Sequence, residues 1–407
     1  MSADRNSNLL VHIVTVPQTL NFLRGQIAYM KRRGFQVAAI ASPGDSGAII
    51  SDAEGIPVYA IQMSRRMTPA RDLVALWKLY RLLVNLKPGI VHAHTPKAGL
   101  LGTLAAFLAR VPVRIYHIRG LPFESARGVR CGLLRWTERV SCRLANRVLA
   151  VSHSMRNIAI RENLCSPRKI EVPAKGSGNG VDANGKFNPS RYGAIVRKEM
   201  RRELRLPSEA VVIGFVGRVV RDKGIVELAQ AWHSIRQENP LAFLLLVGPL
   251  EPQDPVPAST LRMLEGDANV RMTGGVSEVA PFYTAMDILA LPTYREGFPN
   301  VPLEAAAMCL PVVATQIPGC VDAVVNGVTG TLVDPRNPVE LYQALKQYIE
   351  KPELRQLHGS NGRQRVIRDF QQEGIWKAVY AEYRRLLNMS EDVYENPEVE
   401  ELVAHGS

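Results

Sequence analysis

Two stretches of the chain alternate short apolar runs with amphipathic segments, and this alternation constrains the fold more than any other feature. Apolar runs of about four to eight residues bounded by turn residues predict buried strands, and the longer segments between them predict helices. Regular alternation of the two predicts parallel sheets with helices on both faces. The strands expected in the first stretch are 9–16, 35–41, 57–61, 89–94, 113–118, 147–151 and 169–172. Those expected in the second are 211–216, 242–247, 269–272, 287–291, 311–314 and 331–333.

The alternation lapses into polar and basic residues between Val181 and Pro207, which predicts a domain boundary. We place a first domain at residues 1–190 and a second at 191–388, with an acidic tail at 389–407. A chain of 407 residues is long enough to bury two cores of ordinary size. The fold class expected is α/β, with two doubly wound Rossmann-like domains facing across a cleft, because ligands bind at the carboxyl ends of parallel strands.

The charge is divided unevenly between the two stretches. Residues 1–190 contain 27 Lys and Arg against 10 Asp and Glu, a net of +17, and the remaining residues carry a net of −5. A basic domain suits an anionic membrane surface or a phosphorylated substrate. Nucleic acid is not expected, because no binding motif or aromatic-rich basic segment is present. Five dispersed cysteines without metal-ligand spacing predict reduced thiols in a cytoplasmic protein, and neither a signal peptide nor a membrane span is expected.

The segment 293–308 reads as a loop and a helix that follow a buried strand. Its helix start offers unpaired N–H groups and a positive dipole end, which suit a phosphate. Glu296 precedes the loop glycine, Gly297, and Glu304 lies one turn into the helix. Carboxylates accept hydrogen bonds from sugar and ribose hydroxyls, so amides and carboxylates together suit a nucleotide sugar. The alternative is that both glutamates are solvated surface acids.

A second strand–loop–helix segment, 214–224, carries basic residues around its glycines. Arg218 offers a planar fork of donors and Lys223 a mobile point charge, a combination that suits a diphosphate. The spacing differs from that of a Walker loop and from that of the Gly-x-Gly-x-x-Gly dinucleotide turn. These residues therefore favour a diphosphate site of another type.

Together, the two segments resemble the donor site of the retaining glycosyltransferases of family 4. The resemblance rests on Gly217-Arg218, Lys223-Gly224 and the pair Glu296 and Glu304. The segments 179–182 and 94–99 are similar to those of bacterial capsular, exopolysaccharide and O-antigen members. The resemblance implies the GT-B fold, with a last helix at about 364–388 that packs back on the first domain. It also implies transfer of a sugar from a UDP-linked nucleotide sugar to a lipid-linked, polyprenyl-diphosphate glycan, without a metal or a cofactor.

The same resemblance implies roles for individual residues. Retention would follow from attack on the face that the diphosphate leaves, with positive charge assisting its departure. A carboxylate nucleophile cannot be named, because no spacing singles out an acid of the first domain. The expected catalytic residues are His117, Glu296, Arg218 and Lys223. The expected donor contacts are Gly217, Arg218, Lys223, Glu296, Gly297, Phe298, Asn300, Val301 and Glu304. The expected acceptor contacts are Arg24, Gly25, His94 and Lys97, although a solvated lysine and structural histidines are the alternatives.

The helix expected over 127–145 repeats arginine every fourth residue beside an apolar row. Arg135, Arg139 and Arg143 would face an anionic leaflet while Trp136 inserts, which predicts a cytoplasmic protein held on the inner face of the membrane. The alternative is an ordinary amphipathic helix with a charged face.

Two other functions fit the same sequence features. A nucleotide-sugar 2-epimerase has a similar two-domain architecture and would convert the nucleotide sugar without any acceptor. A non-catalytic protein that binds a sugar nucleotide or a polyanion would bind without turnover.

Overall fold

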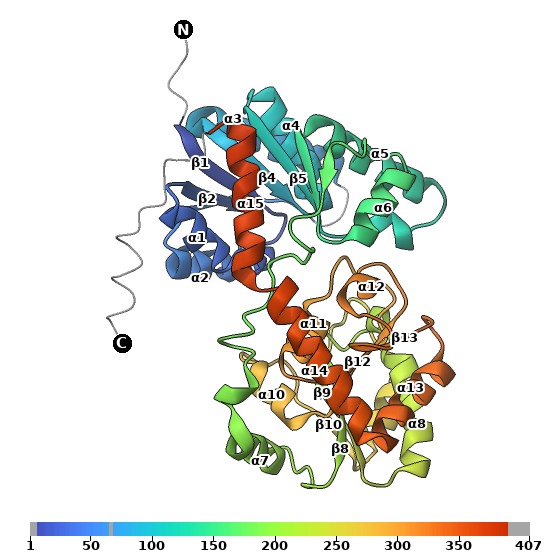
Figure 1. Cartoon of the computed structure of the whole chain (residues 1–407). Helices are drawn as coiled ribbons and strands as arrows, with labels where there is room; N and C mark the ends of the chain where they lie inside the picture. The colour runs from blue at the N-terminus through green and yellow to red at the C-terminus, as the bar shows by residue number, and fades with distance from the viewer. Residues whose placement is uncertain (1–5, 65–67, 390–407) are drawn as a thin grey trace, which may run out of the picture. The chain divides into compact units, whose positions relative to one another are not determined.

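The computed structural model describes residues 6–64 and 68–389, and its chain divides into two compact units (Figure 1). Unit 1 comprises Met1–Ala150, Ala159–Pro173 and Trp376–Ser407, and unit 2 comprises Val151–Ile158 and Ala174–Ile375. Each unit contains one parallel sheet, so the predicted class of two doubly wound α/β domains is confirmed.

The sheet of unit 1 has its first strand near the middle. Its strand order is β3-β2-β1-β4-β5-β6-β7, so the chain builds one side from β1 outward and then crosses to build the other. The junction of β1 and β4 is therefore the point at which the direction of winding reverses, where ligands commonly bind in such sheets. The strands are β1 (Asn6–Ile13), β2 (Gln36–Ala41), β3 (Val58–Ala60), β4 (Pro88–His94), β5 (Val113–Ile118), β6 (Arg147–Ala150) and β7 (Ile170–Glu171).

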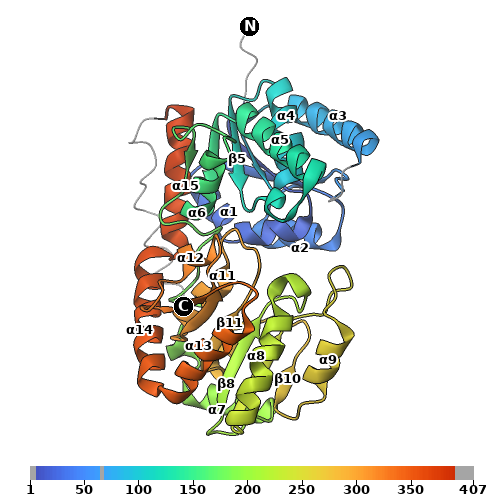
Figure 2. The ribbon, with the colours of Figure 1, turned by 90° about the vertical axis from the view of Figure 1, so that its right-hand side faces the viewer.

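The two faces of this sheet are covered by different helices. Even-numbered residues of β1 such as Leu10 pack with the last helix, α15, whereas odd-numbered residues such as Val11 pack with α3 and α4. Figure 1 shows α15 running along one face of the sheet, and Figure 2 shows α3, α4 and α5 grouped together. The helices are α1 (Gln26–Arg32), α2 (Asp45–Glu54), α3 (Pro69–Leu86), α4 (Pro96–Leu108) and α5 (Gly128–Leu144), with short 3-10 segments at Pro17–Leu23 and Pro122–Ser125. A further helix, α6 (His153–Arg161), begins in unit 2 and ends in unit 1.

Unit 2 repeats this architecture with six strands in the order β10-β9-β8-β11-β12-β13. Its winding reverses between β8 and β11, which are paired through Ile288 and Ile213. The strands are almost wholly apolar and buried, as expected for a sheet covered on both faces. They are β8 (Val211–Val216), β9 (Ala242–Val247), β10 (Val270–Met272), β11 (Ile288–Leu291), β12 (Val312–Thr315) and β13 (Gly330–Val333).

The helices of unit 2 form two layers around one large core, in which α8 packs on α13 and α11 packs on α14. They are α7 (Gly193–Glu203), α8 (Ile225–Glu238), α9 (Ala258–Glu265), α10 (Ala280–Ala285), α11 (Asn300–Ala307), α12 (Cys320–Ala323), α13 (Pro338–Glu350) and α14 (Pro352–Asp369), with 3-10 segments η3 (Pro189–Arg191) and η4 (Arg221–Lys223). The last helix, α15 (Gln372–Leu387), begins in unit 2 and continues into unit 1.

The last part of the chain differs in detail from the sequence prediction. A single helix over about 364–388 was expected, but two helices meet at Phe370 and Gln371. The interruption has a physical cause, because the carbonyl of Phe370 accepts a hydrogen bond from the N–H of Val181 at 2.9 Å. The described part of the tail ends at Met389, so the prediction for the acidic tail lies outside the described residues.

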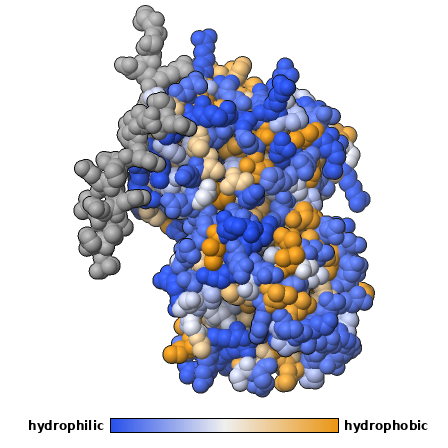
Figure 3. All heavy atoms as spheres, viewed as in Figure 1, coloured by the Kyte–Doolittle hydropathy of each residue, from blue (hydrophilic) through white to orange (hydrophobic). Residues whose placement is uncertain are grey.

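The surface viewed in Figure 3 is largely hydrophilic, with smaller hydrophobic patches between the polar side chains. Within the described residues, no helix combines the length and the apolar character that crossing a membrane requires.

Candidate functional site

The predicted donor residues meet where the winding of unit 2 reverses. The loop after β8 carries Arg218 and Lys223, and the loop after β11 carries Glu296 and Gly297. Because β8 and β11 are neighbours in a parallel sheet, their loops leave from the same edge. Two segments that lie more than seventy residues apart in the sequence therefore form one constellation.

Two glycines determine the backbone path of the loop that follows β8. Gly217 has a φ of 145°, and Gly224, between η4 and α8, has a φ of 73°. A Cβ on Gly224 would lie 1.9 Å from the carbonyl oxygen of Pro292, so only glycine allows the two loops to come this close. Gly224 thus keeps Lys223 beside the β11 loop.

The chemical centre of the constellation is an ion pair between Lys223 and Glu296, whose Nζ and Oε1 are in direct contact. Both side chains are largely enclosed, at 19% and 16% exposure. Arg218 forms a second pair, with Glu251 at 2.7 Å, but half of its side chain is exposed. The predicted cations are thus both present, and Lys223 is the better enclosed of the two.

The segment after Glu296 leads into the first turn of α11. Pro299 is the N-cap residue and makes no side-chain cap bond, so Asn300 and Val301 stand in the first turn, where backbone N–H groups lack partners within the helix. The hydroxyl of Ser152 donates to the carbonyl of Gly297 at 2.9 Å, which orients this loop from outside the β11 segment. The helix start and the Lys223–Glu296 pair together offer N–H donors, a cation and a carboxylate.

Sequence reasoning missed the residues that support this loop. Ser154 donates its hydroxyl to Asp322 and accepts from the N–H of Gly319 at 2.8 Å. Ser177 donates to the side chain of Asn300 at 3.3 Å. The only local signal for the first of these was a pair of serines, Ser152 and Ser154, directly after an expected strand end.

Glu304 lies in α11, and its carboxylate accepts a hydrogen bond from the hydroxyl of Tyr283 at 2.8 Å. Burial raises the pKa of Glu304, while the Tyr283 hydrogen bond and the charge of Lys186 act in the opposite direction. The carboxylate of Glu304 is therefore oriented by Tyr283 as a hydrogen-bond acceptor and is not a solvated surface acid.

Asp182, at the end of the segment 179–182, has a structural role. Its two carboxylate oxygens accept from the N–H groups of Gly185 at 2.7 Å and Lys186 at 2.8 Å. Both oxygens are occupied in a turn of unit 2.

Among the predicted acceptor residues of unit 1, Lys97 is neither solvated nor isolated. Its Nζ contacts both carboxylate oxygens of Asp72 at 2.8 Å. Burial alone would raise the pKa of Asp72, but hydrogen bonds from Lys97 and Thr68 hold it below its ordinary value. Lys97 therefore forms an ion pair between α4 and α3.

Arg24 and Gly25 end the first loop of the chain. Arg24 is exposed, and Gly25 adopts a φ of 74°. A Cβ on Gly25 would lie 2.5 Å from the ring of Trp376, so the close approach that this glycine permits is made by an aromatic ring of α15. The Gly25 N–H donates to Glu54 at 3.1 Å.

His94 and His117 lie side by side at the carboxyl ends of β4 and β5, where the sequence placed them. Both are buried, and neither ring nitrogen of His117 has a hydrogen-bond partner in the part of the chain that the structure describes. Burial first, and the neighbouring charge of Arg119 as well, hold the pKa of each far below its ordinary value. His92 shares their face of the sheet, and its ring stacks on that of His117.

Two of the predicted lipid-contacting arginines of α5, Arg135 and Arg139, have protein partners. Arg135 pairs with Glu162 at 3.0 Å, and Arg139 donates to the carbonyl of Asn163 at 3.0 Å. Trp136 is 56% exposed and Leu133 43% exposed, whereas Val140 and Leu144 farther along the helix are half-buried. The helix therefore presents apolar side chains to the surroundings, as contact with a membrane requires.

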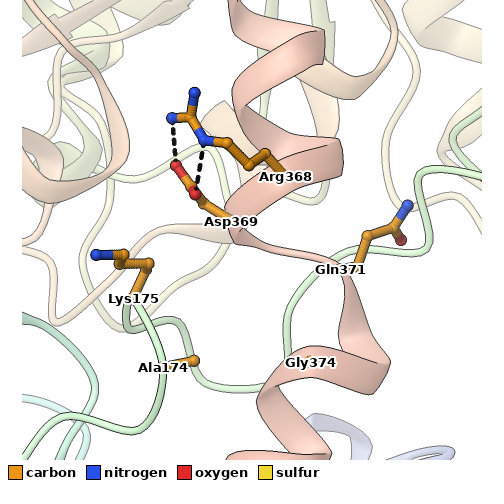
Figure 4. A pocket seen from close by; sticks show the side chains of 6 residues that line it. All are labelled: Ala174, Lys175, Arg368, Asp369, Gln371 and Gly374. Atoms are coloured by element: carbon orange, nitrogen blue, oxygen red, sulfur yellow. Dashed lines mark hydrogen bonds and ion pairs between the residues drawn. The ribbon is translucent and has the colours of Figure 1, made fainter.

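A hollow of about 280 Å³ also lies in unit 2, at the end of α14, and contains none of the predicted site residues. Arg368 and Asp369 form a bidentate pair with distances of 2.9 and 2.7 Å, which lowers the pKa of Asp369. Figure 4 shows Lys175 on the same side as this pair, opposite Gln371. The hollow is lined by Ala174, Lys175, Arg368, Asp369, Gln371 and Gly374.

The two parallel-sheet domains define a protein of the GT-B fold class, and comparisons with known proteins identify its family. The model of the family "Glycosyl transferases group 1" matches residues 196–365, and that of the "Glycosyl transferase 4-like domain" matches residues 21–174. The capsular polysaccharide biosynthesis glycosyltransferase CapM of Staphylococcus aureus is 34% identical over 94% of this chain and 98% of that protein. The chain therefore belongs to the glycosyltransferase family that includes CapM and combines these two domains, as its sequence motifs predicted.

Two further proteins extend the comparison. The UDP-Gal:alpha-D-GlcNAc-diphosphoundecaprenol alpha-1,3-galactosyltransferase of Escherichia coli is 28% identical over 76% of this chain and 78% of that protein. The crystal structure of Anabaena HepE in complex with UDP superposes with a TM-score of 0.75 at 22% identity, covering 92% of this chain and 98% of that chain. The first is similar in sequence, and the second shows the same fold.

Proposed function

We propose that this protein transfers a sugar, with retention of configuration, from a UDP-linked nucleotide sugar to a polyprenyl-diphosphate-linked glycan. The single observation that carries the proposal is the enclosed Lys223–Glu296 pair beside the first turn of α11, at the edge of the sheet where the winding of unit 2 reverses. A relative whose name specifies a UDP-galactose donor and a diphosphoundecaprenol acceptor, together with a fold neighbour in complex with UDP, supports both substrate classes.

The donor would lie with its diphosphate against the positive groups of this constellation. Lys223 and the N–H groups of the first turn of α11 would bind the phosphate oxygens, and Arg218 would supply a further charge from the open side. As the diphosphate departs, these donors stabilise the charge that develops on it. The chemistry needed from this side of the site is therefore leaving-group stabilisation.

Glu296 and Glu304 would serve hydroxyl groups at the two ends of the donor. Glu296 already makes one strong contact with Lys223, so a sugar hydroxyl would donate to its other oxygen. Glu304, oriented by Tyr283, would accept from the ribose hydroxyls. We propose that the sugar then transfers on the face from which the diphosphate leaves, and that a phosphate oxygen takes the proton of the acceptor hydroxyl.

Acceptor binding is assigned to unit 1, with Arg24 and Lys97 as the predicted contacts. Neither His94 nor Gly25 is included in this proposal, because His94 is buried with both nitrogens hydrogen-bonded and Gly25 packs on Trp376. The role of His117 near the reacting sugar stays a prediction. Peripheral attachment to the inner face of the cytoplasmic membrane is proposed through α5, whose exposed Trp136 and Leu133 would insert.

The test is incubation of the purified full chain with membrane lipid extract and a panel of radiolabelled nucleotide sugars. Label that moves into the lipid fraction from a UDP-sugar, and does not move with a Lys223→Ala variant, is the expected result. Epimerisation of the nucleotide sugar without lipid would instead identify a 2-epimerase. Tight UDP binding with no turnover on any lipid fraction would identify a non-catalytic binding protein.

A further inference from the structure

Four buried histidines gather where the winding of unit 1 reverses. His12 pairs in register with His92 across β1 and β4, and His94 pairs with His117 across β4 and β5. Residues directly opposite one another share a face of the sheet, and so do residues two apart on one strand. All four imidazoles therefore lie on the same face, where each is at most 3% exposed.

The ring nitrogens of this cluster are incompletely satisfied. The Nδ1 of His12 and the Nε2 of His94 are 3.0 Å apart. The Nε2 atoms of His12 and His92 and both nitrogens of His117 are buried and have no hydrogen-bond partner within residues 6–64 and 68–389. Buried polar atoms without partners are rare in native proteins and commonly mark a water or an ion. Several such atoms at one place call for a common explanation.

We propose that His12, His92 and His94 bind one divalent transition-metal ion of the zinc class. The three side chains can each offer one nitrogen such that these atoms lie within 4.8 Å of one another. Nitrogens around a tetrahedral Zn²⁺ lie about 2.0–2.1 Å from the metal, and hence about 3.3 Å from one another. A set of imidazoles without a carboxylate selects Zn²⁺, Co²⁺, Ni²⁺ or Cu²⁺ over Mg²⁺, Ca²⁺ or Mn²⁺.

A tyrosine from α15 supports this assignment. The hydroxyl of Tyr383 lies 2.6 Å from the Nδ1 of His92. If the imidazole donates this hydrogen bond, its Nε2 keeps a free lone pair, as a metal ligand requires. The bond fixes the tautomer and orientation of His92, in the way that groups behind a metal ligand commonly do. The metal would thus tie β1 and β4 to α15.

The side chain of Arg119 opposes metal binding, and its substitution therefore provides a test of the proposal. The Nε–H of Arg119 donates to the Nδ1 of His94 at 3.2 Å, and among the described residues no carboxylate forms an ion pair with Arg119. Metal bound at the Nε2 of His94 requires a proton on Nδ1, so Arg119 would have to turn away and its charge would repel the ion. In Arg119→Gln, the side-chain carbonyl oxygen can instead accept a hydrogen bond from the Nδ1–H of His94. This variant should therefore bind metal more tightly than the wild type.

The experiment uses the full chain without a histidine tag, treated with chelator and kept reduced. Titration with Co²⁺ should give the visible absorption of a tetrahedral nitrogen site and saturate at one equivalent, and Zn²⁺ should displace it. Affinity should fall at least tenfold in His12→Gln and in His92→Gln, and by about tenfold in Tyr383→Phe, which keeps the ring and removes only the supporting hydroxyl. Affinity should rise in Arg119→Gln.

His358→Gln is the matched control. His358 is also buried and also bonds a tyrosine hydroxyl, that of Tyr348 at 2.7 Å, but it belongs to no cluster of possible ligands among the described residues. Its variant should bind metal as the wild type does. As a readout that needs no variant, Zn²⁺ should raise the unfolding temperature of the wild type.

Three outcomes would overturn the proposal. The first is a wild type that binds no stoichiometric Co²⁺ or Zn²⁺ and gains no thermal stability from either. The second is binding by His12→Gln and His92→Gln as tight as that of the wild type, which would place any bound metal elsewhere. The third is an Arg119→Gln variant that binds no more tightly than the wild type, which would exclude His94 as a ligand and leave the cluster as a hydrogen-bonded core. None of these results depends on glycosyl transfer.

Discussion

The two points of reversed winding use charge in opposite ways. In unit 2, Lys223 and Glu296 neutralise each other at a partly enclosed site. In unit 1, four buried histidines stand beside Arg119, and no described carboxylate pairs with it. A group that has an opposite charge at hand can exchange that partner for a charged ligand at modest cost, whereas buried imidazoles without one must stay neutral or bind a metal ion. The same topology is thus compatible with a site that can take up a charged ligand in unit 2 and with a closed, buried site in unit 1.

The largest effect is expected where unit 2 buries a charge network. Asp287 accepts from Arg197 and Arg201 at 2.7 Å each and from the N–H of Val212 at 2.8 Å. Asp287→Asn leaves the buried Arg201 without its anion, so the free energy of unfolding should fall by about 3–5 kcal/mol. Denaturant unfolding measures this, with the exposed pair variant Glu238→Gln as control. A loss as small as that of the control would contradict the view that unit 2 depends on paired charge.

Glu138 tests the opposite situation in unit 1. It is buried, its carboxylate accepts a hydrogen bond from Tyr116 at 2.6 Å, and burial raises its pKa to about 7. A raised pKa in the folded state favours folding below the ordinary pKa of a glutamate, and that stability is lost as the pH rises to about 7. Relative to Glu138→Gln, the wild type should therefore lose about 3 kcal/mol between about pH 4.5 and 7 and no more above it.

The measurement is the difference in unfolding free energy between Glu138→Gln and the wild type at several pH values. The buried histidines titrate in both proteins, so their contribution cancels in this difference. A difference that does not change with pH would mean that Glu138 is not held in its neutral form.

Lys223 and Arg218 should contribute unequally to binding of a nucleoside diphosphate. Lys223→Ala removes a charge-assisted bond and leaves the enclosed Glu296 unpaired, so UDP affinity should fall by roughly 1.5–3 kcal/mol, which is about 10- to 150-fold. Arg218 is half exposed, so Arg218→Ala should cost less. Calorimetric titration with UDP compares the two, and unchanged affinity in both variants would remove the diphosphate assignment.

The two glutamates of unit 2 should divide their effects between kcat and KM. Glu296→Gln should mainly lower kcat, because contacts to the sugar ring strengthen as the ring takes on positive charge. Glu304→Gln should mainly raise KM and weaken free UDP, since ribose binding is the same in the ground and transition states. Tyr283→Phe, which removes the hydroxyl that orients Glu304, should resemble Glu304→Gln in a weaker form. If Glu296→Gln lost UDP binding and Glu304→Gln kept it, the donor would lie in the reverse orientation.

The smallest effect is expected at the surface of α5. Replacing Arg135, Arg139 and Arg143 by Gln should weaken binding to anionic vesicles at low salt by about 1 kcal/mol per residue that is free to contact lipid. Arg135 and Arg139 already have protein partners, so most of the loss should come from Arg143, while Trp136→Ala should weaken insertion. Vesicle sedimentation measures both, with UDP affinity as the control. Wild-type protein that ignores anionic vesicles would rule out this surface.

The fold and the two loop segments around Lys223 and Glu296 were predictable because their signals are local. Buried strands read as apolar runs, and Gly217, Arg218 and Lys223 lie in one loop segment, 214–224. Contacts that depend on strand order, including the one between Lys223 and Glu296, were not predictable. His12 meets His94 only because β1 and β4 are neighbours, and Lys97 meets Asp72 only because α3 packs on α4. The support of Gly297 by Ser152 likewise depends on a segment that lies 145 residues earlier in the chain.

The passage of α15 into unit 1 has a consequence for synthesis of the protein on the ribosome. Val379 and Tyr383 belong to the core of unit 1, and Trp376 packs against Gly25 in the same unit. Between Pro173 and these residues lies almost the whole of unit 2. At about 5–20 residues per second, roughly 10–40 s separate emergence of Pro173 from that of Trp376, where the part of α15 that belongs to unit 1 begins. The first part of the chain to be made is therefore the last to be completed, and this face of its sheet is only partly covered, by residues such as Leu20 and Ile27, until the second unit has been synthesised.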